Sequence, residues 1–240
     1  MYMNYSRHTP VVAILMLAVM FSFTCSIPVL QAEEGLTKQI EQAEQEQIEL
    51  YPETIAVLQT LYGNEVRARH RYQLFSATAK ADGHTNIAHL FKSIAASEAV
   101  HERNFSRILE SLGAKVPEID LSTIKASITQ DNLKYATNVE LSEIDKEYPQ
   151  YISRVSPENH KEALEYINYA WEAERQHREL IKEIKSGTGF FFSVLLERFR
   201  ENKSTYYVNQ HCGATVMALP EGACPICHKP LDTYKEVPKP

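Results

Sequence analysis

The residues best suited to chemistry in this sequence are glutamates and histidines that recur at helical spacing. Glu98 and His101 form a Glu-x-x-His pair, and Glu174 and His177 form a second pair with the same spacing. Residues three apart lie one turn apart on the same face of a helix, so each pair can offer a carboxylate and an imidazole to one site. Three further glutamates occupy comparable places in two other predicted helices: Glu65, Glu140 and Glu143.

These acidic residues lie on the apolar stripes of their helices, with apolar residues one or two turns away on either side. An unpaired buried carboxylate costs several kcal/mol, and no Lys or Arg lies on the same stripes to neutralise the acids. Two metal ions would balance them, and carboxylate oxygens with one imidazole per ion suit iron or manganese. One Glu-x-x-His pair alone is typical of a helix surface. The repetition over four helices instead predicts a dinuclear carboxylate site.

The elements that must position these residues are four long helices. The apolar periodicity predicts helices over residues 53–82, 84–112, 122–155 and 158–186. Their connections are short, and only eight glycines occur in 240 residues. Both features favour an antiparallel four-helix bundle over residues 53–186. Pro149 is expected to kink or end the third helix.

The first thirty-two residues are typical of a signal peptide. Arg7 precedes an uncharged apolar run from Val11 to Phe23, and Leu30-Gln31-Ala32 offers a small-residue cleavage site. The expectation is export, to the periplasm, with cleavage near Ala32. An uncleaved anchor is one alternative, and lipidation at Cys25 is another, although the residues before Cys25 make a poor lipobox.

The remaining segments divide at composition changes. Residues 33–52 are rich in Glu and Gln and form a lead-in segment, and residues 187–202 form a linker with a short amphipathic helix. Residues 203–240 change to short strand-like pieces and form a small module, whose core is too small to fold without a staple. The 25 basic against 31 acidic side chains give no basic footprint for nucleic acid.

The sequence resembles the rubrerythrins, which are ferritin-like di-iron proteins with a rubredoxin-like tail. The resemblance covers roughly residues 54–240 and is carried by motifs in the family's order and spacing. They are EVRARHRY at residues 65–72, IAASEAVH at 94–101, NL at 132–133, ELSE at 140–143, YP at 148–149 and ERQH at 174–177. The implied fold is mainly α, a ferritin-like four-helix bundle with a small C-terminal β module.

The resemblance also implies roles for individual residues. It implies two iron ions, with Glu98 and Glu174 as bridging ligands; the implied ligands are Glu65, Glu98, His101, Glu140, Glu174 and His177. Glu143 matches the extra carboxylate that exchanges with His101 on one iron as the redox state changes. Tyr72 and Tyr148 match tyrosines that hydrogen-bond the carboxylates. The family's usual activity is the reduction of hydrogen peroxide to water, and its usual assembly is a homodimer.

The C-terminal module departs from the family pattern. A rubredoxin site needs two Cys-x-x-Cys turns, which place four thiolates around one iron. The second turn is present as Cys224-Pro-Ile-Cys227, but in the first turn Asn209 stands where the cysteine before Cys212 is expected. The site could hold iron or zinc through Cys212, Cys224 and Cys227 with a substitute ligand from Asn209, His211 or water. It could instead be metal-free or disulfide-bonded, or transfer electrons as in ordinary rubredoxins. We expect electron delivery through this module to be impaired or altered.

Three functions follow from these expectations. The first is an exported di-iron peroxidase that takes electrons from an unknown donor. The second is a ferroxidase or iron-handling protein that uses the same site with oxygen or peroxide and needs no tail donor. The third is a bundle whose metals are structural. Glu143 and Tyr72 favour the first, whereas the missing cysteine favours the second.

Overall fold

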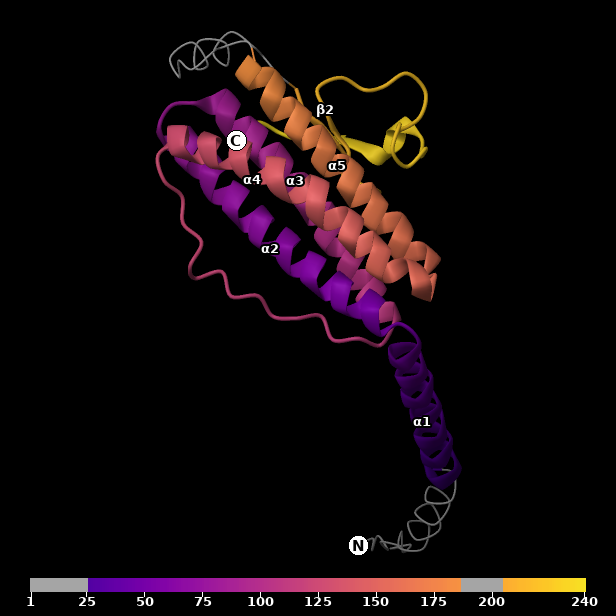
Figure 1. The fold of residues 1–240 in the computed structure, drawn as a ribbon. Helices are drawn as coiled ribbons and strands as arrows, with labels where there is room; N and C mark the ends of the chain where they lie inside the picture. The colour runs from indigo at the N-terminus through magenta and orange to yellow at the C-terminus, as the bar shows by residue number, and fades with distance from the viewer. Residues whose placement is uncertain (1–25, 187–204) are drawn as a thin grey trace, which may run out of the picture. The chain divides into compact units, whose positions relative to one another are not determined.

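The computed structural model describes the backbone of residues 26–186 and 205–240 (Figure 1). It describes the side chains of these ranges except for residues 26–31, 137–143, 145 and 182–186. The apolar run of the predicted signal peptide and the predicted amphipathic helix of the 187–202 linker therefore lie outside the described residues. The chain divides into two compact units, residues 1–46 and 47–240.

The first unit contains most of helix α1, Ser26–Leu50. Every described side chain from residue 32 to residue 46 is exposed, and the hydroxyl of Thr37 donates to the carbonyl of Glu33 at 2.8 Å. None of the helices in the described part of the chain combines the length and the apolar character that a membrane crossing requires.

Four long helices form the body of the second unit, as the sequence predicts. They lie side by side along a common direction in Figure 1. Their bounds are Pro52–Ala81 for α2, Thr85–Ser111 for α3, Thr129–Val155 for α4 and Lys161–Ser186 for α5. The expected fold class, a mainly α ferritin-like bundle followed by a small β module, is confirmed.

The third helix begins seven residues later than the sequence predicts, at Thr129 instead of residue 122. The Asp120 carboxylate accepts the Ser122 N–H at 2.8 Å, which favours a local turn over a helix. Asp82, which follows α2, accepts hydrogen bonds from the Thr129 N–H at 3.3 Å and the Thr129 hydroxyl at 2.6 Å. The start of α4 is therefore set by a side chain from the connection between α2 and α3.

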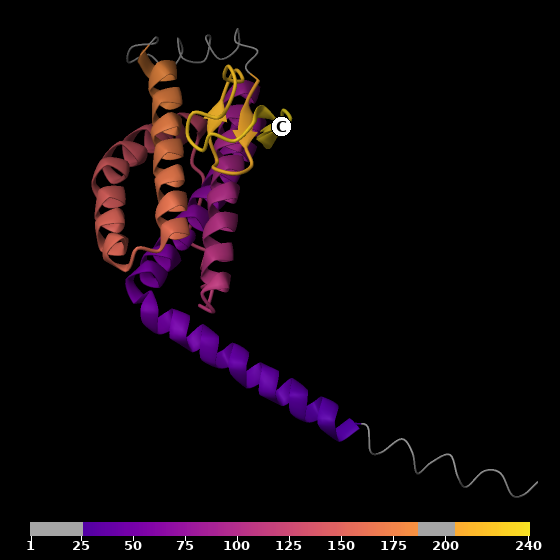
Figure 2. The ribbon, with the colours of Figure 1, turned by 90° about the vertical axis from the view of Figure 1, so that its right-hand side faces the viewer.

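The expected effect of Pro149 is only partly right. Pro149 does not end α4, which continues to Val155. Figure 2 shows α4 following a curved path beside the straighter α5. A short 3-10 helix, η1 (Ser156–Glu158), then ends at Asn159, whose φ of 52° lies in the left-handed region, so α5 begins three residues later than predicted.

The bundle core consists of two apolar clusters, one towards each end. Phe75, Phe91 and Ile94 belong to one cluster, and Leu61 and Phe105 belong to the other. The predicted site residues lie in sequence between members of the two clusters, and they are buried too: Glu65 4%, Glu98 1%, His101 2%, Glu174 8% and His177 0% exposed. The predicted inward direction is confirmed for Glu65, Glu98 and Glu174, and it stays a prediction for Glu140 and Glu143.

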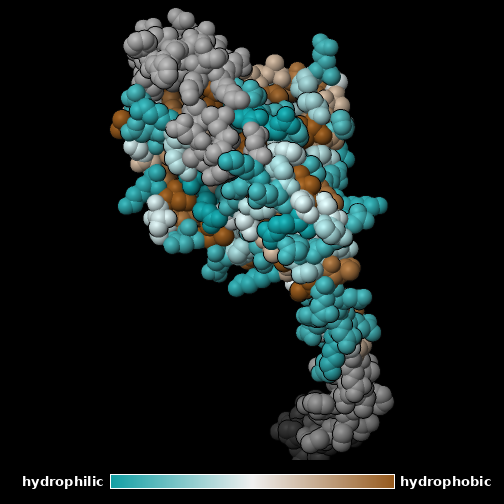
Figure 3. Space-filling view, viewed as in Figure 1, coloured by the Kyte–Doolittle hydropathy of each residue, from teal (hydrophilic) through white to brown (hydrophobic). Residues whose placement is uncertain are grey.

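The C-terminal module contains a small antiparallel sheet with strand order β2-β1-β3. The strands are β1 (Tyr207–Asn209), β2 (Thr215–Val216) and β3 (Tyr234–Glu236), and a 3-10 helix, η2 (Leu231–Thr233), precedes β3. The module packs beside α3 and α5 (Figures 1 and 2). The face of the molecule shown in Figure 3 is mainly hydrophilic, with hydrophobic residues scattered over it.

Polar contacts fasten the loop between β1 and β2 to α3. The Ser97 hydroxyl donates to the Gly213 carbonyl at 2.6 Å, and the Asn104 amide donates to the His211 carbonyl at 2.8 Å. Gly213 has a φ of 82° and lies directly against the His101 ring. A Cβ atom at this position would overlap Nε2 of His101 and lie 2.9 Å from the Ser97 hydroxyl oxygen.

These contacts predict a large loss of stability in Gly213→Ala. Gly222, in the same module, has a φ of 89°, but a Cβ atom added there would meet no other atom within 4 Å, so Gly222→Ala is a matched control for backbone strain alone. We expect Gly222→Ala to lower the free energy of unfolding by about 1–2 kcal/mol. Gly213→Ala should lower it by about 1–3 kcal/mol more, because it also overpacks the docked loop. Urea denaturation measures both, and equal losses would contradict the docking contact.

Candidate metal centre

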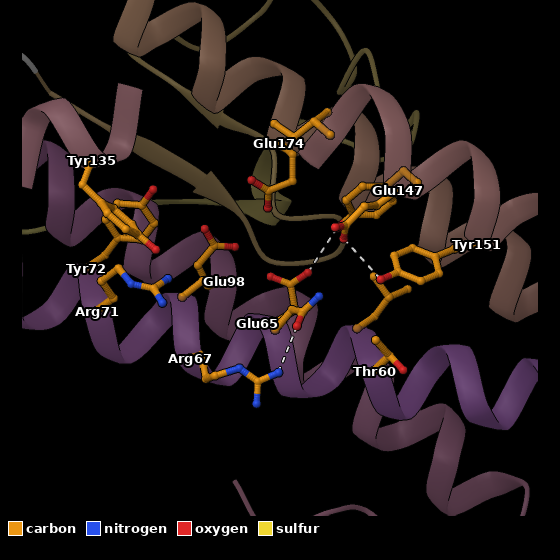
Figure 4. A pocket seen from close by; sticks show the side chains of 15 residues that line it. Thr60, Glu65, Arg67, Arg71, Tyr72, Glu98, Tyr135, Glu147, Tyr151 and Glu174 are labelled. Atoms are coloured by element: carbon orange, nitrogen blue, oxygen red, sulfur yellow. Dashed lines mark hydrogen bonds between the residues drawn. The ribbon is translucent and has the colours of Figure 1, made fainter. Parts of the chain in front are cut away.

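Four predicted ligands from three helices meet at the centre of the bundle. Glu65 comes from α2, Glu98 and His101 come from α3, and Glu174 comes from α5. One ligand atom from each of the four lies within 4.8 Å of those from the others. Figure 4 shows the three carboxylates pointing towards one another. The second histidine, His177, completes the group with Nδ1 at 3.2 Å from Glu174 Oε2 and 3.8 Å from Glu98 Oε1.

The donor atoms of this cluster suit metal ions better than they suit one another. His101 Nδ1 faces carboxylate oxygens of Glu98, Glu174 and Glu65 at 3.3, 3.4 and 3.5 Å. Glu98 Oε2, His101 Nδ1 and Glu174 Oε1 are buried without a well-directed hydrogen bond within the described part of the chain. Buried polar atoms normally have partners, so atoms left in this condition around one point fit bound cations. Carboxylates and imidazoles are ligands that suit iron.

The burial of these groups shifts their pKa values in the metal-free protein. Burial raises the pKa of Glu98 well above its usual value, and the charges of Glu174 and Glu65 add to this effect. Burial alone would lower the pKa of His101, but the adjacent carboxylates outweigh it and hold the pKa well above the usual value. Burial opposes ionisation of Glu174, but His177 and His101 keep the pKa of that carboxyl low. The cluster therefore retains protons that cations would displace.

The outer nitrogens of both histidines are bound to the C-terminal module. His101 Nε2 donates to the Cys212 carbonyl at 3.2 Å. The Thr215 hydroxyl donates to the Gly213 carbonyl, so it accepts from His177 Nε2 at 3.1 Å. These bonds place a proton on each Nε2 and leave each Nδ1 free to bind metal. The sequence motifs gave no signal for Thr215 or for the role of Gly213, because this contact depends on how the module docks.

The two remaining acidic residues lie on α4. Glu140 and Glu143 belong to this helix, but their side chains lie outside the described residues. Their assignment as ligands remains a prediction. Tyr72 is buried, lines the cavity beside the site and packs its ring against Phe75 and Phe91, with centroids 5.9 Å apart in each case.

Tyr148 contacts a site carboxylate directly. Its hydroxyl donates to Glu65 Oε1 at 3.2 Å, and its ring is stacked on Trp171. Burial raises the pKa of Tyr148 well above its usual value, and the charges of Glu65, Glu174 and Glu98 raise it further. The phenol therefore stays protonated and keeps donating its proton to Glu65.

A cavity of about 410 Å³ reaches the cluster between α2 and α4. Glu65, Glu98 and Glu174 form its inner wall, and Arg67 and Arg71 belong to its polar lining (Figure 4). The cavity admits small polar molecules to the carboxylates. Sequence analysis did not identify the two arginines, because their positions on α2 look like those of an ordinary charged helix face.

A second cluster lies inside the C-terminal module. The thiols of Cys212, Cys224 and Cys227 are free, buried and within 4.8 Å of one another. Asn209 is fully buried beside them, with Oδ1 at 3.9 Å from the Cys227 sulfur. The His211 ring packs against Tyr166 and Tyr169 instead, with centroids 5.4 and 5.7 Å apart, and does not belong to the cluster.

A rubredoxin-type iron site does not fit this second cluster. Such a site needs four thiolates, and an amide group stands in the fourth place. Of the substitute ligands considered from the sequence, His211 is excluded by its packing, whereas Asn209 lies where a ligand is needed.

The pKa shifts of the glutamate and histidine cluster predict that ferrous iron displaces protons when it binds. Titration of metal-free protein with Fe(II) at pH 7 in a weak buffer should release protons, and iron affinity should fall as the pH is lowered. Glu98→Gln should release fewer protons and retain less iron than the wild type. Glu102→Gln is the matched control, because Glu102 lies one turn away on α3 and pairs with Arg69 at 2.7 Å. Equal iron retention in both variants would contradict the site.

Comparison with known proteins agrees with this geometry. The family model described as Rubrerythrin matches residues 57–185. Rubrerythrin-2 of Clostridium acetobutylicum is 30% identical over 191 residues, which cover 76% of this chain and 95% of that protein. A putative rubrerythrin of Methanocaldococcus jannaschii is 28% identical and covers 76% of this chain and 92% of its own.

Solved structures of nigerythrin, in mixed-valence and fully reduced states, share the fold. Each has a TM-score of 0.64 at 23% identity and covers 77% of this chain and 86% of its own. The buried glutamate and histidine cluster at the centre of the bundle is a group of residues that could hold metal ions. The chain belongs to the rubrerythrin family, whose members are oxidoreductases with a di-iron centre in a ferritin-like bundle.

Proposed function

We propose that this protein reduces hydrogen peroxide to water at the di-iron site. The observation that carries the proposal is a buried cluster of carboxylates and imidazoles that opens into a small polar cavity. A cluster that served stability alone would gain nothing from such an opening, and apolar side chains would stabilise the core better. The third function, a bundle with structural metals, is therefore disfavoured.

The bound iron pair would supply the two electrons that the reduction of one peroxide molecule requires. Glu65, Glu98, Glu174, His101 and His177 would hold the ions, together with Glu140 and, in one redox state, Glu143. The reaction also consumes two protons. Tyr148 keeps a proton at its hydroxyl, directed at Glu65 Oε1, and so fixes the orientation of this carboxylate at the end of the cavity.

The surrounding residues limit what reaches the site. Leu61, Phe91, Ile94 and Phe105 are at most 1% exposed, and they close the bundle on either side of the acids. Because these apolar side chains replace water on both sides of the acids, interactions between charges at the carboxylates are stronger than in solution. The cavity is large enough for peroxide or oxygen.

Ferroxidase activity is the second candidate, and one observation favours it. The C-terminal module lacks the fourth thiolate of an electron-transferring rubredoxin site. A ferroxidase needs no donor beyond the ferrous ions that it oxidises, whereas a peroxidase must be reduced again by a donor that remains unidentified.

We further propose that the protein is exported to the periplasm and acts there as a homodimer. The proposal of export rests on the charge and apolar pattern of residues 1–32. The proposal of a homodimer rests on the family resemblance.

The proposed activity predicts that peroxide oxidises the diferrous protein much faster than oxygen does. Stopped-flow mixing of diferrous protein with each oxidant, with iron counted per chain, measures the two rates. Faster reaction with oxygen, together with retention of the oxidised iron as a growing store, would show a ferroxidase instead.

Two tyrosine variants refine this comparison. Tyr148→Phe should slow oxidation by peroxide about tenfold, because the hydrogen bond that orients the Glu65 carboxyl group is lost. Tyr151→Phe is the matched control, since the Tyr151 hydroxyl donates to Glu147 at 3.2 Å. Equal rates in the two variants would remove Tyr148 from the mechanism.

Export predicts a shorter mature chain in the producing cell. N-terminal sequencing of protein from a periplasmic fraction should begin at Glu33, directly after Ala32. Full-length chain in the cytoplasmic fraction would contradict export, and a membrane-bound chain that retains its N-terminus would indicate an uncleaved anchor.

A further inference from the structure

The two turns that carry the cysteines of the C-terminal module share one backbone geometry. In each turn the N–H of the first residue donates to the carbonyl of the residue five positions later. The carbonyl of the first residue accepts the N–H of the residue four positions later. The four hydrogen bonds all measure 2.9 Å and join Asn209 N to Ala214 O, Gly213 N to Asn209 O, Cys224 N to Lys229 O and His228 N to Cys224 O. The residue four positions after the first has a positive φ in both turns, 82° in Gly213 and 56° in His228.

The side chains at the first position of the two turns also correspond. The Cys224 sulfur accepts backbone N–H groups from the second- and third-next residues, Ile226 and Cys227. Oδ1 of Asn209 accepts the N–H of His211 at 2.8 Å and that of Cys212 at 3.3 Å, which are again the second- and third-next residues. The amide oxygen of Asn209 thus takes the place of a cysteine sulfur without disturbing the turn.

A hydrogen bond from outside the turn fixes this amide. Nδ2 of Asn209 donates to the Thr233 hydroxyl at 2.8 Å, and that hydroxyl donates to the Pro230 carbonyl at 2.6 Å. Because the nitrogen side is held in this way, the oxygen side faces the thiols. Tyr234 donates its hydroxyl to the Cys224 sulfur at 3.2 Å and orients a second member of the group.

The spacing of the four groups suits a tetrahedral ion. The sulfurs of Cys212 and Cys224 are 3.7 Å apart, and Oδ1 of Asn209 is 3.9 Å from the Cys227 sulfur. A tetrahedral zinc ion, with bonds of about 2.3 Å to sulfur and about 2.1 Å to oxygen, separates two sulfur ligands by about 3.8 Å and a sulfur from an oxygen by about 3.6 Å. The two measured separations differ from these values by only a few tenths of an ångström.

The donor set favours zinc over iron. Thiolates select thiophilic ions, and zinc binds a given site more tightly than ferrous iron does. Zinc has no geometric preference of its own and therefore accepts three sulfurs with one amide oxygen. Replacing an anionic thiolate by a neutral amide removes one of the charges that stabilise ferric iron in a four-thiolate site.

The loop that carries Asn209 and Cys212 also contacts the di-iron site. The Cys212 carbonyl accepts the Nε2 proton of His101 at 3.2 Å, and the Thr215 hydroxyl lies 3.1 Å from His177 Nε2. Partners of this kind orient ligating histidines, so an ion that fixes the loop also fixes both rings.

We propose that the C-terminal module binds one zinc ion through Cys212, Cys224, Cys227 and Oδ1 of Asn209. This redox-inert ion holds the loop that orients His101 and His177, and the module serves as a clamp on the di-iron site, not as its electron relay. The proposal does not depend on which oxidant the di-iron site uses.

The first test is the metal preference of the full chain. Metal-free protein is offered an excess of Fe(II) with one equivalent of Zn(II) per chain, the metal content is counted, and the visible spectrum is recorded before and after dithionite. The wild type should bind one zinc in addition to two irons and show no thiolate-to-iron band. Asn209→Cys, which restores the fourth thiolate, is loaded with Fe(II) alone and should then show a thiolate-to-iron band that dithionite bleaches. Such a band in the wild type, or a disulfide among the three cysteines with no zinc bound, would overturn the proposal.

The second test concerns the amide oxygen. Co(II) in place of zinc should give a thiolate-to-cobalt band whose intensity corresponds to three thiolates in the wild type and four in Asn209→Cys. Asn209→Ala should bind zinc at least about tenfold more weakly in competition with a chelator. If Asn209→Ala fails to fold, the cobalt comparison still decides, because equal intensities in the wild type and Asn209→Cys would overturn the assignment.

The third test addresses the clamp. Selective removal of zinc from the di-iron protein should broaden the Mössbauer signals of the two irons and speed the loss of iron to a chelator, and added zinc should restore both. Unchanged signals and unchanged iron retention without zinc would show that the ion does not orient the histidines.

Discussion

The need to bury several carboxylates between two apolar clusters governs this structure. Glu65, Glu98 and Glu174 leave water on folding, and the hydrogen bonds of the described chain do not satisfy all their oxygens. Cations settle this deficit, so the stability of the bundle and the affinity of its metal site have the same origin. The acids lie between the two apolar clusters, and a cavity reaches them from one side.

Residues outside the glutamate and histidine cluster hold its members in place through hydrogen bonds. Tyr148, which lies on α4, donates its hydroxyl proton to the Glu65 carboxylate. The C-terminal module accepts the Nε2 protons of His101 and His177. Each histidine is thereby fixed in the tautomer that presents Nδ1 to metal. The module thus belongs to the architecture of the bundle's active centre, even though its own cysteine cluster is a thiolate short of the usual family pattern.

The sequence predicted the parts of the structure that depend on local periodicity. Two Glu-x-x-His pairs on apolar stripes were sufficient to place Glu98, His101, Glu174 and His177 in the core, because burial of a charged residue needs a compensating partner. The start of α4 could not be predicted, since it depends on Asp82 reaching across from another connection. The packing of Gly213 against His101 could not be predicted from the sequence either, because contacts between residues more than a hundred positions apart leave no periodic signal.

The hydrogen bond between His101 and the Cys212 carbonyl connects the glutamate and histidine cluster with the loop that carries a cysteine of the second cluster. Coupling between two binding equilibria is reciprocal, so any change in iron affinity caused by ordering the cysteine loop must be returned as an equal change in the loop's own affinity for its ligand. Loss of iron from the bundle would then loosen the module, and damage to the module's thiols would weaken iron binding in the bundle. Through this contact and the one between His177 and Thr215, metal scarcity and thiol oxidation would each act on both regions.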